Sequence, residues 1–180
     1  MSDETTGPNG SAAPTAAGAA GAAAEQAPPR LSILTQYIKD MSFENPRAPQ
    51  PPQQPGSRPE IQIKVDVQAK ALGEDRYEVT LVTNVDAKAN EETIFLMELT
   101  YAGVFHLANI PQDSLQPLVM IECPRLLFPF ARRIVADATR DGGFPPLMID
   151  PIDFVTLYRR KLQEAQAKTQ AGAVPPPVAS

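Results

Sequence analysis

The sequence predicts an α+β fold, a four-stranded antiparallel sheet with two helices packed on one face. Three observations predict it. In four stretches between residues 36 and 101, apolar and polar side chains alternate with a period of two, which is typical of strands with one buried face. Beyond residue 123 the apolar residues recur at helical spacing. The strands all precede the helices, and this order is typical of α+β domains.

The first predicted strand spans Gln36–Glu44, where alternate side chains are apolar. A segment with six prolines between Pro46 and Pro59 follows it. Proline has no backbone N–H, so this segment is predicted to be an extended connection rather than a strand or a helix. The first strand therefore need not lie beside the second.

The next three predicted strands follow one another closely. They span Glu60–Ala71, Tyr77–Asp86 and Glu92–Tyr101, with turns of only a few residues between them. Because short turns join antiparallel neighbours, these strands are expected to pair in sequence order. In the last strand, Ile94 and Leu96 lie on the parity opposite to the predicted core face, which indicates surplus apolar surface for binding.

Two helices are predicted after the strands. The first spans Cys123–Arg140 and is expected to stop at Gly142 and the glycine that follows it. The second begins after Asp153, whose side chain is a good N-cap. The apolar residues of the second helix form one stripe: Phe154, Leu157, Tyr158 and Leu162.

Composition divides the chain into three parts. Residues 1–30 are rich in alanine, glycine and proline and contain no aromatic residue, leucine, isoleucine or valine. Such a segment has little apolar surface to bury against the entropy of ordering, so we predict a disordered extension. Residues 165–180 are predicted to be a disordered tail for the same reason. Residues 31–164 are the predicted folded domain.

The charge and the cysteine content restrict the partners and the compartment. The chain has 180 residues with 21 acidic and 16 basic side chains, and its net charge of −5 disfavours nucleic acid or an anionic membrane as the main partner. The single cysteine excludes an intramolecular disulfide and favours a reducing compartment. No apolar run approaches the roughly 20 residues of a membrane helix, and the polar N-terminal segment is unlike a signal peptide. We therefore expect a soluble, cytoplasmic protein without membrane insertion.

Reactive groups are scarce in this sequence. His106 and Cys123 are the only histidine and the only cysteine, and both have apolar neighbours, which favours structural roles. No spacing fits a zinc site, and no glycine-rich loop fits a phosphate. We therefore predict no catalytic residue, no metal and no cofactor. An enzyme that uses Cys123 with His106 remains the alternative.

Six segments between Tyr37 and Leu162 carry a resemblance to a known family. They read YIKDMSFENPRAP, YEVTLVTNVDA, EETIFLMEL, YAGVFHLANI, CPRLLFPFARRIV and GGFPPLMIDPIDF. These segments are similar to those of the SecB-type protein-export chaperones. The resemblance implies a homotetramer, built as a dimer of dimers, that binds unfolded preproteins in apolar grooves and holds them without ATP. It also implies delivery of these clients to SecA, the ATPase of the translocase.

The resemblance also implies three sets of site residues. The SecA-binding set, on the acidic outer face of the sheet, is Asp40, Glu44, Leu96 and Glu98. The client-binding set is Ile61, Ile63, Val65, Phe154, Tyr158 and Leu162. The set that tunes the pairing of dimers is Met97, Leu99 and Tyr101. For the apolar members a role in the core stays open, and so does the alternative function of a SecB-like peptide-binding adaptor that is not coupled to SecA.

Overall fold

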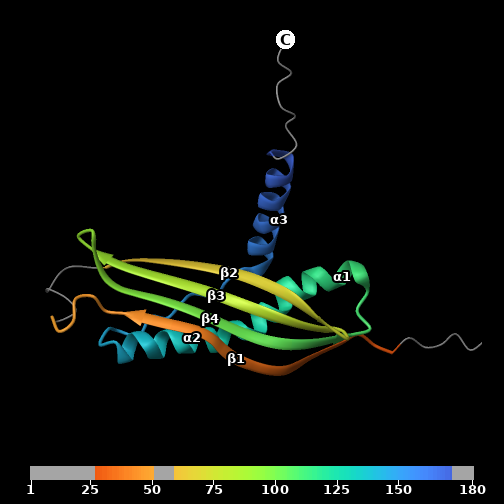
Figure 1. Ribbon diagram of the computed structural model, residues 1–180, viewed down its shortest axis with the longest axis horizontal. Helices are drawn as coiled ribbons and strands as arrows, with labels where there is room; N and C mark the ends of the chain where they lie inside the picture. The colour runs from red at the N-terminus through yellow and green to blue at the C-terminus, as the bar shows by residue number, and fades with distance from the viewer. Residues whose placement is uncertain (1–26, 51–58, 172–180) are drawn as a thin grey trace, which may run out of the picture.

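The computed structural model describes residues 27–50 and 59–171. Four long strands form one antiparallel sheet (Figure 1): β1 (Arg30–Glu44), β2 (Glu60–Gly73), β3 (Arg76–Ala89) and β4 (Glu92–Ala108). Their order across the sheet is β1-β4-β3-β2. Consecutive strands β1 and β2 thus lie at opposite edges of the sheet, an arrangement that the proline-rich connection was expected to allow.

Two tight hairpins connect the last three strands. Glu74 and Asp75 join β2 to β3, and Asn90 and Glu91 join β3 to β4. All four residues have positive φ, from 51° to 66°. Two-residue loops with this backbone match the right-handed twist of the flanking strands. The short turns predicted from the sequence therefore fix the register of three strands.

The helices follow the sheet. α1 (Gln112–Pro117), the π-helical η1 (Leu118–Glu122) and α2 (Cys123–Asp141) run directly into one another, and α3 (Phe154–Ala171) comes last. The sequence predicts α2 and α3 but not α1 or η1, because their short apolar pattern is interrupted by proline. α2 lies across β3 and β4 on one face of the sheet (Figure 1).

The expectation that both helices pack on the sheet is wrong for α3. Only its first turns enter the core, where Phe154 is buried, and the rest of the helix leaves the sheet past β2 (Figure 1). The physical reason is its sequence. Beyond Leu157 the apolar stripe is narrow and charged residues surround it, so little apolar surface is left to bury.

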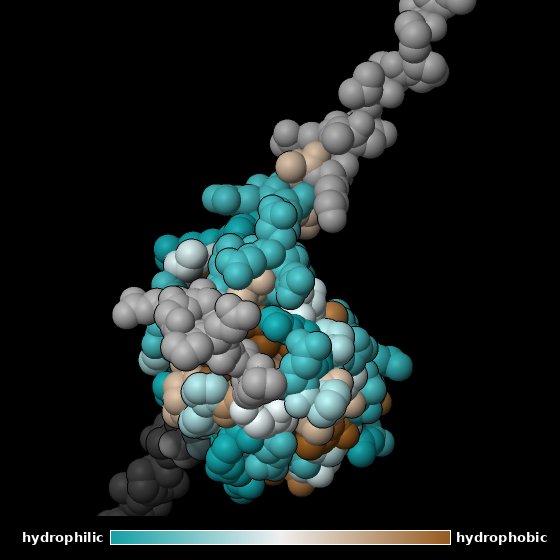
Figure 2. Space-filling model, turned by 90° about the vertical axis from the view of Figure 1, so that its left-hand side faces the viewer, coloured by the Kyte–Doolittle hydropathy of each residue, from teal (hydrophilic) through white to brown (hydrophobic). Residues whose placement is uncertain are grey.

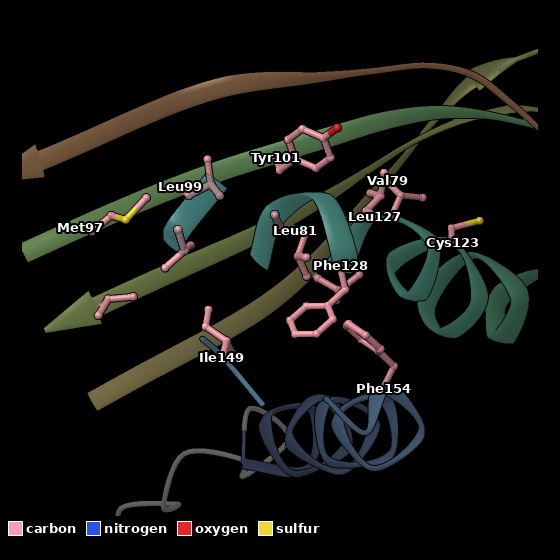
Figure 3. Packing of buried hydrophobic residues seen from close by; sticks show 14 of the residues in the cluster. Val79, Leu81, Met97, Leu99, Tyr101, Cys123, Leu127, Phe128, Ile149 and Phe154 are labelled. Carbon is pink, nitrogen blue, oxygen red and sulfur yellow. The ribbon is translucent and has the colours of Figure 1, made fainter. Parts of the chain in front are cut away.

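The core lies between the sheet and α2. Val79, Leu81 and Leu99 point to the helical side of the sheet, where Leu127 of α2 lies next to Val79, and all four side chains are fully buried (Figure 3). Phe128 of α2 and Phe154 of α3 meet edge to face, with ring centroids 6.0 Å apart (Figure 3). This aromatic pair anchors the start of α3 to α2.

A glycine in the middle of β4 sets the distance between the sheet and α2. β4 continues to Ala108, beyond its predicted end at Tyr101, and passes through Gly103. A Cβ atom at Gly103 would lie 2.8 Å from Leu127 Cδ2 and 3.0 Å from the ring of Phe105. Gly103 therefore gives Leu127 the room to pack directly on the strand.

Irregular strand pairing explains two errors of the sequence prediction, one in the length of β1 and one in the face of the sheet on which Ile94 lies. β1 begins at Arg30 rather than Gln36, because register shifts at Ile33/Thr35 and Ile38/Asp40 break its period of two. A further shift in the β3–β4 pairing lies beside Ile94. Ile94 is consequently buried in the core, and the prediction that it adds to the exposed apolar surface is wrong.

The ends of the helices follow their predicted signals. The Asp153 carboxylate accepts hydrogen bonds from the backbone N–H groups of Val155 and Thr156, so it caps α3 as predicted. The hydroxyl and backbone donors of Thr156 lower the pKa of Asp153. α2 ends at Asp141 with Gly142 as its C-cap, so the predicted stop at this glycine is also confirmed.

The predicted terminal segments meet the described residues only in part. Of the predicted extension, residues 1–26 lie outside the described residues, and β1 already begins at Arg30. α3 continues to Ala171, beyond the predicted domain end at Glu164. Alanine, glutamine and lysine dominate this stretch, and they are good helix formers. Residues 51–58 of the proline-rich connection and 172–180 of the tail also lie outside the described residues.

Glu78 links β1 to β3 across the outer face of the sheet. Its carboxylate accepts hydrogen bonds from the Tyr37 hydroxyl at 2.5 Å and from Lys39 Nζ at 2.9 Å. These two donors, the tyrosine first, lower the pKa of Glu78. A carboxyl group with a lowered pKa in the folded state contributes stability above the ordinary pKa of glutamate, and this contribution is lost as pH falls through the lowered value.

We expect Glu78→Gln to lower the free energy of unfolding by about 1 kcal/mol at pH 7, because a partly screened pair and a hydrogen bond to a charged group are weakened. Urea denaturation measures this difference. The gap between the variant and the natural chain should close in acid, once Glu78 is protonated. Glu74→Gln, in an exposed pair with Arg76, is the control and should have little effect. A gap that persists in acid would contradict the assignment.

Candidate functional site

The predicted SecA-binding residues come together on the outer face of the sheet, which is the face away from α2. In the strand register Glu44 pairs with Leu96, and the adjacent Ser42 pairs with Glu98. Asp40 pairs with Thr100 one step further along. The sheet therefore displays Asp40, Glu44 and Glu98 as exposed carboxylates beside the half-buried Leu96.

Asp86 belongs to the same acidic surface, although the sequence analysis does not select it. It pairs with Leu96 from the other side, so that Leu96 lies between two carboxylates, Glu44 and Asp86. These residues and Glu98 line a shallow depression of about 310 Å³. Only the pairing of β3 with β4 distinguishes Asp86 from the other polar residues of its strand. We name Asp40, Glu44, Asp86, Leu96 and Glu98 the acidic face.

A second depression lies between β2 and the helical segments. It has a volume of about 630 Å³, and more apolar than polar residues line it. Its lining residues are Val67, Gln68, Ala69, Ala71, Tyr77, Gln112, Leu115, Gln116, Val119, Met120 and Lys161. We call it the β2 groove. The sequence analysis misses its α1 and η1 walls because it predicts no helix there.

The predicted client-binding residues do not all reach the surface. Ile61 and Ile63 lie on edge strand β2 and are 38% and 37% exposed, which is high for isoleucine. Leu162 of α3 is 36% exposed, and Tyr158, one turn before it, is half-buried. Val65 is also half-buried and packs against the core.

Phe154 is the exception among the predicted client-binding residues. Only 1% of it is exposed, because it packs against Phe128 (Figure 3). Within this chain its role is therefore in the core. The other members are at least partly exposed along β2 and on α3.

The residues predicted to tune dimer pairing are also core residues of this chain. Met97, Leu99 and Tyr101 are buried beneath α2 (Figure 3). The Tyr101 ring stacks on Phe130 of α2, with centroids 6.5 Å apart, and its hydroxyl donates a hydrogen bond to Gln36. Burial raises the pKa of Tyr101. Any effect of this set on assembly therefore passes through its neighbours.

Those neighbours form an exposed apolar strip along β1 and α2. Ile38 and Met41 pair with Tyr101 and Leu99 and lie on the same side of the sheet. The strip consists of Ile33, Ile38, Met41, Leu126 and Phe130, each at least 39% exposed. We name it the β1–α2 strip. Hydrophobic patches also lie among hydrophilic ones at the end of the molecule seen in Figure 2.

Cys123 and His106 do not form a catalytic pair. Cys123 is fully buried on α2, and burial raises the pKa of its thiol to about 12. His106 alternates along β4 with Phe105 and Leu107, which are both in the core, so it faces the opposite side of the sheet. The thiol is therefore packed and inert, as the sequence predicts, and the sheet separates it from the imidazole.

The described residues contain neither a cluster of metal ligands nor a membrane-spanning helix. Across residues 27–50 and 59–171, no three side chains of His, Cys, Asp or Glu converge as a metal site requires. In the same part of the chain, none of the helices combines the length and the apolar character needed to cross a membrane.

The acidic face, the β2 groove and the β1–α2 strip are surfaces suited to holding other polypeptides, so the class they define is a protein-binding protein. The family model described as preprotein translocase subunit SecB matches residues 24–165. The chain therefore belongs to the SecB family of protein-export chaperones, which is not a class of enzyme.

Relatives and a solved structure agree with this family. The protein-export protein SecB of Afipia carboxidovorans is 57% identical over 156 residues, covering 87% of this chain and 96% of that protein. The SecB of Bartonella quintana is 53% identical over 142 residues, covering 79% of this chain and 90% of its own. A SecB-like chaperone of Mycobacterium tuberculosis, solved in complex with an antitoxin peptide, has the same fold. Its TM-score is 0.53 at 20% identity, and the match covers 69% of this chain and 91% of that one.

Proposed function

We propose that this protein is an ATP-independent holdase of the cytoplasm, which binds unfolded preproteins, keeps them competent for export and delivers them to SecA. The observation that carries the proposal is the β2 groove beside the outer edge of β2, which pairs with no other described strand. Membership of the export-chaperone family supports it. No catalytic residue, metal or cofactor is needed for such holding.

Client binding rests on apolar area and on backbone pairing. Exposed Ile61 and Ile63 continue the apolar face of the sheet along β2, and Tyr158 and Leu162 flank the path on α3. An extended segment can bury alternate side chains against these residues and pair its main chain with the strand. Recognition of this kind tolerates many sequences, as a chaperone of unfolded chains requires.

Delivery to SecA rests on the acidic face. Its carboxylates lie in adjacent rows of the sheet around Leu96, so a basic patch on SecA would meet an apolar centre with a charged rim. The acidic face is on the opposite side of the sheet from α2. SecA and a client held on the α2 side can therefore bind at the same time, which a handover requires.

Assembly as a homotetramer, a dimer of dimers, rests on the β1–α2 strip. Five exposed apolar residues lie together on an edge strand and on the helix that covers it. Single exposed apolar residues are common on protein surfaces, but a continuous patch of this kind indicates an interaction site. A second copy is the occupant we propose, because a two-fold axis along β1 would bring the same strip of both chains together. Multivalent holding of one long client would then follow.

We expect Met41→Lys to weaken self-association about tenfold, because a lysine on the strip would carry its charge into the contact. Sedimentation velocity over a concentration series measures the shift. Thr35→Lys adds the same charge to an exposed position of β1 that faces the other side of the sheet, and it is the control. Unchanged assembly of the Met41 variant would contradict the placement of the interface.

Native mass spectrometry of the full chain, alone and with an unfolded preprotein and SecA, tests the proposed function. The expected result is a tetramer that takes up a client chain without nucleotide and then forms a complex that includes SecA. A tetramer that ignores the client would overturn the holdase assignment. A monomer would overturn the proposed assembly.

One alternative keeps the chaperone fold without the export partner. The solved neighbour from Mycobacterium tuberculosis is a SecB-like chaperone in complex with an antitoxin peptide. A peptide-binding adaptor that does not bind SecA is therefore the second candidate. Uptake of unfolded client with no complex that includes SecA would favour this candidate.

A further inference from the structure

The outer edge of β2 offers hydrogen-bonding groups at every second residue. Val67 pairs with Leu81 of β3, yet its carbonyl oxygen accepts a hydrogen bond from Lys161 of α3. The N–H and C=O groups of one residue in an antiparallel strand point to the same side. The backbone groups of Val67, and those of Val65 and Ile63 on the same parity, therefore face the outer edge.

Lys161 occupies this edge at one point. Its Nζ atom lies 2.5 Å from the Val67 carbonyl oxygen and 2.8 Å from Asp66 Oδ1, so one ammonium group bridges α3 to β2. The side chains of Lys161 and Asp66 are 42% and 48% exposed, so solvent reaches the bridge, whereas Val67 itself is only 2% exposed. Lys161 also lines the β2 groove.

We propose that Lys161 is a specificity-determining residue that competes with the main chain of the client for the edge of β2. A client strand that pairs across Val67 needs the carbonyl that the ammonium group holds. Before Val67, from Ile61 to Val65, a strand can add without displacing Lys161. Lys161 thereby sets how far a bound segment can extend toward the β2 groove.

The competition favours some clients over others. Segments that pair only beside Ile61 and Ile63 bind without cost, whereas longer segments must break the Lys161 bridge. A client segment with a carboxylate at this position can replace Asp66 as the partner of the ammonium group. Such a segment therefore loses less binding free energy than an uncharged one when the Lys161 bridge breaks. The residue therefore discriminates by segment length and by charge. This inference rests on the proposed function, since it concerns the same client site.

The variant Lys161→Met tests the proposal, because it keeps an unbranched stem and removes the charge and the donors. The probe is an uncharged synthetic peptide of alternating valine and threonine, long enough to pair along the whole of β2. We expect the full-length variant to bind it about fivefold more tightly, or about 1 kcal/mol. Lys70→Met is the matched control, since Lys70 lies on β2 itself, is exposed and pairs with Glu78 on the outer face of the sheet.

A second set of probes separates edge competition from a general loosening of α3. The same peptide, N-methylated at alternate amides in either register, lacks the donors for strand pairing. The gain in Lys161→Met should disappear with the methylated peptide of the pairing register. Equal or weaker binding by the variant, or a gain that survives both methylations, would overturn the role of Lys161. Binding of the probe by neither the natural chain nor the variant would overturn the proposed client site as well.

Discussion

Replacing Gly103 by valine is expected to lower the free energy of unfolding by about 3 kcal/mol. The added Cβ alone would lie 2.8 Å from Leu127 Cδ2, well inside van der Waals contact, and two methyl groups would follow it. Both Gly103 and Leu127 lie where β4 meets α2, so neither element can move without disturbing the core. Overpacking of this kind typically costs about 1–3 kcal/mol, and valine adds more than one methyl group.

Chemical denaturation of the Gly103→Val variant measures the loss, and two further variants show its cause. Gly73→Ala tests the replacement of a glycine at a turn, where an added Cβ would meet no atom within 4 Å. Only the positive φ of 87° disfavours alanine there, so we expect the free energy of unfolding to fall by about 1 kcal/mol. Leu127→Ala combined with Gly103→Val should cost less than the sum of the two single substitutions, because the shorter side chain removes the clashing atoms. Strict additivity of the two substitutions would contradict direct contact between these residues.

Reversing two charges on the acidic face is expected to weaken SecA binding about a hundredfold. Glu44 and Glu98 lie on neighbouring strands, in adjacent rows of the outer face of the sheet. Glu44→Lys and Glu98→Lys together therefore make this part of the acidic face repel a basic partner. About 1.4 kcal/mol for each site gives the hundredfold change. Both side chains are exposed, and the fold should therefore tolerate the change.

Titration calorimetry at two salt concentrations measures this effect, since surface charge contacts weaken as salt rises. The control reverses the exposed Asp113 and Asp150, which changes the net charge equally but away from the sheet face. Client uptake should be unaffected in both double variants. If the control lost SecA binding as strongly as the test variant, net charge rather than the acidic face would decide the interaction. If the test variant lost client uptake too, the specific assignment would fail.

Regular alternation carried most of the information on the sheet. β3 follows a period of two from Tyr77 to Ala87, and its predicted core face is the buried one, although Thr80 on the other face is buried too. The turn signals at the ends of β3 correctly predicted the hairpins, because two-residue loops leave little freedom in pairing. The order of the strands was also constrained in advance, since the proline-rich connection separates β1 from β2.

The rest depends on contacts between distant residues. Gly103 resembles a strand break in sequence, and only the position of Leu127 reveals it as a packing site within β4. Register shifts in β1 and beside Ile94 move side chains between faces, and no local pattern marks them. The direction of α3 depends on how much of its stripe other elements can cover.

The candidate site was predictable to a similar extent. The acidic residues Asp40, Glu44 and Glu98 could be grouped from motifs, and the strand register places them together. Asp86 could not be added, because its membership depends on the pairing of β3 with β4. Lys161 is one of several lysines in the sequence, and only its contact with the Val67 carbonyl distinguishes it.

The crossed strand order has a consequence for synthesis. β1 leaves the ribosome first, but its pairing partner β4 is made only after β2 and β3 are complete. At about 5–20 residues per second, β1 waits for several seconds with its main chain unpaired and its apolar side chains in water. Closing so long a loop is also slow, because its entropy must be lost before any contact rewards it. During this interval the nascent chaperone is itself an unfolded polypeptide with an exposed apolar strand, the kind of chain that the finished protein is proposed to hold.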